Sequence, residues 1–108
     1  MVCGIDNQLL LSRLKEALIA AFGPRLRGVV LYGSQARGDA EPDSDIDVLV
    51  LLDGPVEFGR DLDPCIHAIY PLILELERPI HALPVDSEEY ARESIPLYAS
   101  AKREGILA

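Results

Sequence analysis

The sequence is poor in cysteine, has no long apolar run and carries no excess of basic residues. Its two cysteines, Cys3 and Cys65, lie far apart and form no metal-binding spacing, so we expect two reduced thiols. The longest apolar run, Val48–Leu52, has the length of a strand, well short of the roughly 20 residues that a membrane span needs. Residues 1–22 contain no recognisable secretory signal. We therefore expect a cytoplasmic protein without a membrane segment.

The charge balance is acidic, with 18 Asp and Glu residues against 10 Lys and Arg residues and a formal net charge of −8. Affinity for nucleic-acid backbones comes from clustered basic residues, so direct binding to duplex nucleic acid is not expected. An acidic surface remains compatible with a nucleotide that binds together with a metal cation. The length of 108 residues fits one domain, which we place at residues 1–108.

The first half of the chain alternates helical and strand patterns. Apolar residues at helical spacing predict a helix over residues 7–22, which Gly23-Pro24 ends. Residues 26–32 and 45–52 are typical of strands. Between them we expect a short helical turn after Ser34 and a loop over residues 39–44 that contains Pro42. Because the strand over residues 45–52 is apolar on both faces beyond Asp47, it should be central in the sheet.

The second half predicts two further helices around one strand. Asp63 is typical of an N-cap with Pro64 in the first turn, and the helix should run to about Arg78 with a kink at Pro71. Its end, with Glu75, Glu77 and Arg78, should be solvated, and we expect a shorter strand over residues 79–85. Asp86 or Ser87 then caps a last helix, which Pro96 divides and which ends near Gly105.

These elements predict an α/β fold, with helices packed on a small mixed sheet of about three strands. The link between the first two strands, residues 33–44, is short for a parallel crossover, so those strands should be antiparallel.

The segment over residues 33–50, GSQARGDAEPDSDIDVLV, combines two features with chemical meaning. Gly33 and Ser34 follow a strand and begin a helical turn, where backbone amides and a hydroxyl can donate to phosphate. Asp45 and Asp47 begin the next strand and should point to one face, about 6–7 Å apart, as an oxygen platform suited to Mg²⁺. Arg37 lies one turn beyond Ser34, where it could neutralise phosphate charge.

Each feature alone has a plain structural reading. A Gly-Ser pair is usually an ordinary turn, and Asp-Ile-Asp can be a solvated strand start. Their combination, with a strand on either side, favours a functional site, because two adjacent like charges serve no structural purpose.

The segment GSQARGDAEPDSDID resembles the signature of the DNA-polymerase-β-type nucleotidyltransferase superfamily, and most closely that of its minimal nucleotidyltransferases, often encoded beside a HEPN-domain partner. The resemblance implies that Gly33 and Ser34 hold nucleotide phosphates and that Asp45 and Asp47 bind Mg²⁺. It implies transfer of a nucleoside monophosphate, usually AMP from ATP, to an acceptor hydroxyl with release of pyrophosphate. The chain has no room for an acceptor domain, so a HEPN-type protein or a homo-oligomer is the expected partner, and an antitoxin the expected role.

The sequence departs from the superfamily in one respect, because the strand PIHALPV carries no third carboxylate. His81 could replace that acid as a base, or could be an ordinary edge-strand histidine. Asp86 is better explained as a helix cap. The missing acid supports an alternative function, a nucleotide-binding module that inhibits its partner by docking alone. Tyr70, Tyr90 and Tyr98 are expected in the core or at an interface.

Overall fold

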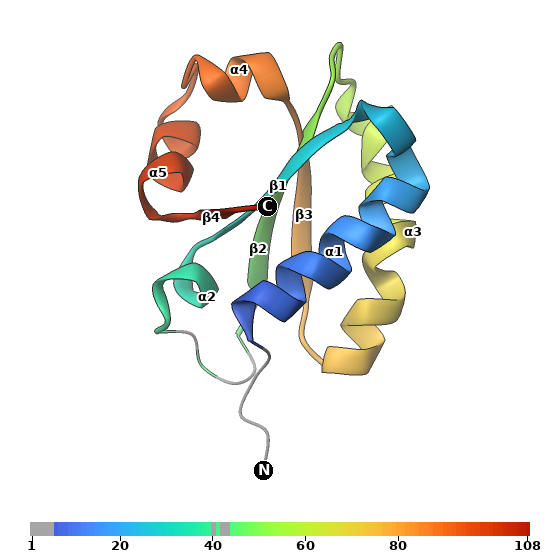
Figure 1. The fold of residues 1–108 in the computed structure, drawn as a ribbon, viewed down its shortest axis with the longest axis vertical. Helices are drawn as coiled ribbons and strands as arrows, with labels where there is room; N and C mark the ends of the chain where they lie inside the picture. Colours follow the sequence, from blue (N-terminus) through green and yellow to red (C-terminus); the bar gives the residue numbers. More distant parts are fainter. Residues whose placement is uncertain (1–5, 40, 42–43) are drawn as a thin grey trace.

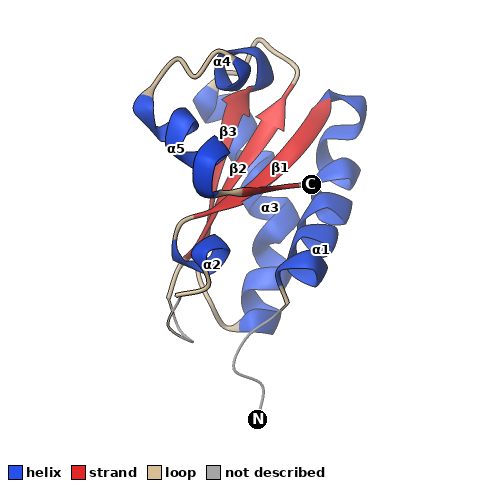
Figure 2. Cartoon of the chain, turned by 60° about the vertical axis from the view of Figure 1, so that its left-hand side comes forward, coloured by secondary structure: helices blue, strands red, loops and turns tan. Residues whose placement is uncertain are grey.

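The chain forms a four-stranded mixed sheet with helices on both faces (Figures 1 and 2). The computed structural model describes residues 6–39, 41 and 44–108, so the expected thiol of Cys3 and the turn at Pro42 lie outside the described residues. None of the helices in these ranges has the length and apolar content to cross a membrane. In chain order the elements are α1 (Asn7–Phe22), the 3₁₀ turn η1 (Gly23–Arg25), β1 (Leu26–Tyr32), α2 (Ser34–Arg37), β2 (Ile46–Leu52), α3 (Phe58–Leu76), β3 (Ile80–Asp86), α4 (Ser87–Ala91), α5 (Pro96–Glu104) and β4 (Ile106–Leu107).

The sheet has the strand order β3-β2-β1-β4. β1 and β2 are antiparallel and β2 and β3 are parallel, which confirms the predicted mixed sheet. β4 was not predicted. It has two residues and pairs with β1 through Val30 and Leu31. So short a strand has no periodic pattern of its own, and its conformation depends on the partner that the fold supplies.

Both faces of the sheet are buried, because β2 is apolar on alternate sides throughout Val48–Leu52. α1 and α3 cover one face, and α4 and α5 cover part of the other (Figure 1). The predicted central position of β2 is therefore confirmed. The first core contains Leu10, Leu14, Leu18, Val29, Leu31, Ile46, Val48, Val50, Leu52, Cys65 and Ile69, and the second contains Val30, Leu49, Leu51, Val85, Tyr90 and Ala101.

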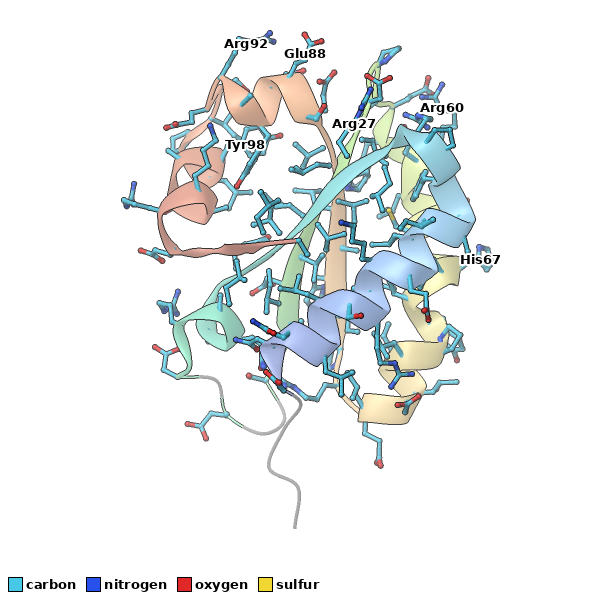
Figure 3. The ribbon with its side chains drawn as sticks, viewed as in Figure 1. Arg27, Arg60, His67, Glu88, Arg92 and Tyr98 are labelled. Carbon is cyan, nitrogen blue, oxygen red and sulfur yellow. The ribbon has the colours of Figure 1, made fainter. Side chains whose placement is uncertain are left out.

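The start of α3 differs from the prediction, because the helix begins at Phe58 and continues through Pro64 and Pro71. The cause is the buried carboxylate of Asp61. It accepts the backbone N–H of Glu57 at 3.0 Å and a guanidinium hydrogen bond from Arg25 at 2.9 Å. These bonds tie the N-cap backbone at Glu57 and the Arg25 side chain to the first turn, so the helix begins at Phe58 and Asp63 lies inside it. Figure 3 shows Arg60 in the same turn, where it also bonds Asp61 at 3.2 Å.

The remaining boundaries lie close to their predictions. β3 has seven residues, as many as β1 and β2, so the expected shorter strand is wrong. The Asp86 carboxylate accepts the backbone N–H of Glu88 at 2.8 Å, which confirms the predicted cap. Pro96 begins α5 and Gly105 ends it, as expected.

Candidate functional site

Three side chains from three neighbouring strands lie in one row on the sheet. Tyr32 of β1 pairs with Asp47 of β2, and Asp47 pairs with His81 of β3. Side chains that are paired across a sheet share a face, so all three lie on the α4/α5 side. The row is at the end of β3 opposite α4. Ile46 is fully buried on the other face, which leaves Asp45 and Asp47 on the same side as the row.

The predicted carboxylate pair has His81 beside it. His81 Nε2 lies 2.8 Å from Asp45 Oδ2, and the two side chains are 62% and 54% exposed. Because an ionised carboxylate only accepts hydrogen bonds, the ring must donate through Nε2 in this contact. In a neutral ring, Nδ1 is then left as a proton acceptor. Asp45 thus orients an accessible base at the surface.

Gly33 forms the turn between β1 and α2 with a backbone that favours glycine, at φ +76° and ψ −156°. Any Cβ at this position would lie 2.7 Å from Asp47 Oδ2. The missing side chain therefore keeps one oxygen of Asp47 open toward the turn. The Gly-Ser turn and the Asp pair, which are separate in sequence, meet at this contact.

Burial raises the pKa of two members of the row, Asp47 and Tyr32. It raises the pKa of Asp47, and the like charge of Asp45 raises it further, while His81 opposes the rise. Burial and the charge of Asp47 both raise the pKa of the Tyr32 phenol. The half-buried Asp47 therefore gains from a nearby cation more than a fully solvated carboxylate would.

Ser34 and Arg37 occupy opposite ends of the four-residue helix α2. In the described part of the chain, the Ser34 hydroxyl makes no hydrogen bond. The Arg37 guanidinium lies 3.4 Å from Asp39 and 3.6 Å from Glu104. Arg37 thus faces α5, where it lines a small pocket together with Tyr32, Gly33 and Glu104. α2 is anchored by Gln35, whose side chain donates to Asn7 Oδ1 at 2.8 Å.

Two residues near the site were missed by the sequence analysis. Arg78 was expected in a solvated helix end, but it is buried, and its Nε donates to the Ser44 carbonyl at 2.9 Å. It therefore holds the backbone immediately before Asp45. Tyr32 was assigned only to a strand, because the register that places it beside Asp47 is not visible in the sequence.

Asp86 is excluded from the site by its register. It pairs with Leu52 at the far end of β2, whereas His81 pairs with Asp47. Five residues of extended strand separate His81 from Asp86, which corresponds to about 16 Å. Along β3, His81 is therefore the side chain nearest to the carboxylate pair that can accept a proton.

The site residues fit a divalent cation only in part. In the described ranges, no group of three or more His, Cys, Asp and Glu side chains is arranged to hold a metal ion. The protein offers two hard carboxylates, with Asp47 left open by Gly33. Mg²⁺ is commonly held by one or two carboxylates together with substrate phosphates. The donor set therefore suits a cation that arrives with a nucleotide.

Comparison with known proteins gives consistent matches. The nucleotidyltransferase domain model matches residues 11–102. A candidate protein adenylyltransferase from Methanocaldococcus jannaschii is 32% identical over 91 residues, which cover 84% of each chain. A crystal structure of a toxin–antitoxin complex with AMP-PNP is similar with a TM-score of 0.63 and 18% identity, over 89% of this chain and 69% of that one. A candidate nucleotidyltransferase from Sulfolobus solfataricus has a TM-score of 0.55 and 22% identity, over 93% and 76%.

Proposed function

Because this chain belongs to the nucleotidyltransferase domain family, we propose that it transfers AMP from ATP to a hydroxyl group of a partner protein, with Mg²⁺. The observation that supports the proposal is the position of the Asp47 carboxylate beside Gly33, where any Cβ would lie 2.7 Å from Asp47 Oδ2, so that the Gly-Ser turn and the carboxylates form one site. The Methanocaldococcus relative, named for protein adenylylation, supports the choice of AMP and of a protein acceptor. The AMP-PNP in the toxin–antitoxin neighbour supports the choice of nucleotide.

Asp45 and Asp47 are the residues that would hold Mg²⁺. When bound, the cation would neutralise charge on the triphosphate and polarise the α-phosphate. Asp47 is half-buried and its pKa is raised by burial, so a cation beside it would stabilise its ionised form, while exposed Asp45 accepts a hydrogen bond from His81 Nε2. Because Gly33 has no side chain, a phosphate can approach the backbone of this turn closely.

Ser34 and Arg37 would bind the phosphates of ATP that leave as pyrophosphate. The Ser34 hydroxyl is available as a donor at the start of α2. Arg37 would exchange its two exposed ion pairs, with Asp39 and Glu104, for phosphate. Exposed ion pairs contribute little stability, so this exchange costs little.

His81 would remove the proton of the acceptor. The acceptor oxygen forms a bond to the α-phosphorus, the bond from that phosphorus to the bridging oxygen breaks, and pyrophosphate leaves. The hydroxyl proton passes to Nδ1 of His81, whose Nε2–H is directed to Asp45. His81 thus does the work for which the superfamily uses a third carboxylate.

A toxin partner of the HEPN type fits this reaction best, with the present chain as its antitoxin. The similarity to a toxin–antitoxin complex supports a partner, and a homo-oligomer is the alternative. A second candidate function is inhibition by docking alone. It is favoured by one observation, the absence of a carboxylate on β3 beside Asp47.

The test combines binding and transfer. Asp45→Asn and Asp47→Asn should each abolish Mg²⁺-dependent ATP binding in calorimetry while the fold remains, because removing one like charge relieves repulsion in the metal-free site. His81→Ala should keep ATP binding but lose transfer of α-labelled AMP. Unchanged ATP affinity in both Asp variants would exclude the proposal that Asp45 and Asp47 hold Mg²⁺. Intact binding with no transfer by the unmodified protein would favour docking alone.

A further inference from the structure

In the part of the chain that the structure describes, β3 forms one edge of the sheet, and some of its backbone groups beside His81 point away from β2. Ile46 N–H donates to the carbonyl of Pro79, so in the parallel ladder residues 81, 83 and 85 face β2. The N–H and C=O groups of Ile80 and Ala82 then point away from the sheet. Pro84 also points outward and has no N–H. The edge can therefore accept another strand only along its first half, next to the site.

An apolar groove of about 430 Å³ follows this edge. Leu62 and Ile66 of α3 line one side, while His81 and Leu83 line the side that faces the site. α3 carries half of the large exposed apolar side chains in the described residues, and three of them are at i, i+4 spacing. Exposed apolar side chains gathered on one helix beside a groove are typical of an interaction site. On α3 these exposed residues are Phe58, Ile66, Tyr70 and Leu74.

The order of the strands indicates which reactant enters from this edge. Gly33 and Ser34 follow β1, the carboxylates are on β2, and His81 is on β3. In phosphoryl transfer the attacking and leaving oxygens are roughly in line with phosphorus. If the leaving pyrophosphate is held at Gly33 and Ser34, the attacking hydroxyl must approach from the β3 side. The groove lies on that side.

We propose, on the premise of the function proposed above, that this groove binds an extended segment of the acceptor protein as a strand added to β3. Side chains of a strand alternate, so every second residue of the segment would pack on Leu62 and Ile66. The residue between them carries the hydroxyl and faces His81.

Charge limits the sequence of that segment. Asp63 and Glu77 are exposed on α3 and at its C-cap, and Asp45 is exposed at the site. The whole chain has a net charge of −8. An acceptor segment flanked by Lys or Arg complements this surface, and an acidic segment would be repelled.

The test measures transfer from α-labelled ATP with Mg²⁺ to protein in a soluble extract of the source cells, followed by identification of the labelled residue. Ile66→Asp places a charge in the groove, and Ala82→Pro removes the outward N–H as Pro84 already does. Ile19→Asp is the matched control, because Ile19 is also an exposed helical isoleucine, 48% against 45% for Ile66, but lies on α1. Each groove variant should lower labelling by about tenfold or more, with unchanged ATP affinity, while the control labels like the unmodified protein.

The labelled hydroxyl should lie in a segment of alternating apolar residues with basic flanks, and a synthetic peptide of that segment should compete. Equal labelling by the groove variants and the control would overturn the proposal. So would a dimer that dissociates in Ile66→Asp with labelling unchanged, since a second copy would then occupy the groove. Absence of ATP binding by the unmodified protein would instead overturn the proposed function itself.

Discussion

Replacing Gly33 by alanine should have two effects, one on the stability of the turn and one on the binding of ATP at the site. The backbone of Gly33, at φ +76° and ψ −156°, is in a region that is almost reserved for glycine, so alanine should cost about 1–3 kcal/mol of unfolding free energy. The new methyl group would also lie 2.7 Å from Asp47 Oδ2. The carboxylate is the end of a side chain and can rotate away at small cost in stability. Its rotation would, however, remove it from the cation position.

Gly23 provides a matched control. Its backbone is in the same region, at φ +58° and ψ −134°, and a Cβ there would meet nothing within 4 Å. Gly23→Ala and Gly33→Ala should therefore lose a similar amount of stability, about 1–3 kcal/mol. Only Gly33→Ala should also weaken Mg²⁺-dependent ATP binding, by about 10- to 100-fold, as when a metal ligand is displaced but not deleted.

Thermal unfolding measures the first effect, since 1 kcal/mol shifts the Tm of a domain of this size by about 4–8 °C. Calorimetry with ATP and Mg²⁺ measures the second. If Gly33→Ala bound ATP as well as Gly23→Ala does, the contact between the turn and Asp47 would have no part in binding, and the reasoning would be refuted.

Three further substitutions address single contacts. Ser34→Ala should weaken ATP binding by the roughly 1.5–3 kcal/mol of one hydrogen bond to a charged acceptor and leave the Tm almost unchanged; a large fall in Tm with normal affinity would make Ser34 a structural residue. Asp86→Ala should cost about 1 kcal/mol of stability, for the lost cap of α4, without an effect on transfer. The hydrogen bond from Arg25 lowers the pKa of Asp61, so its contribution is complete above about pH 4, the ordinary Asp value, and is lost as pH falls below it. Asp61→Asn should therefore lower stability by about 1–3 kcal/mol at pH 7 in urea unfolding, and a difference that did not shrink on acidification would contradict the ion pair.

Local pattern was enough to predict most elements. The spans of α1 and β1, the cap at Asp86 and the end at Gly105 depend on periodicity, turn residues and caps within a few positions. The antiparallel pairing of β1 and β2 followed from the short link between them. Even the face shared by Asp45 and Asp47 needed only the alternation of a strand.

The errors at the start of α3 and at Arg78 share one physical cause, which is contact between residues distant in sequence. α3 starts early because Arg25 bonds Asp61, which is 36 positions away. Arg78 is buried because Ser44, 34 positions away, accepts its hydrogen bond. Neither partner can be identified from the neighbourhood of the other.

The sequence by itself determined the order of elements, the family and the identity of the Gly-Ser turn and the carboxylate pair, because these are properties of contiguous residues. Only the tertiary structure decided the rest of the site. The register of three strands placed Tyr32, Asp47 and His81 in one row, and it put Asp86 at the far end. The sheet order left β3 at an edge, with the apolar side of α3 beside it. Register and edge position depend on which segments pair, and that choice is made by the packing of the whole chain.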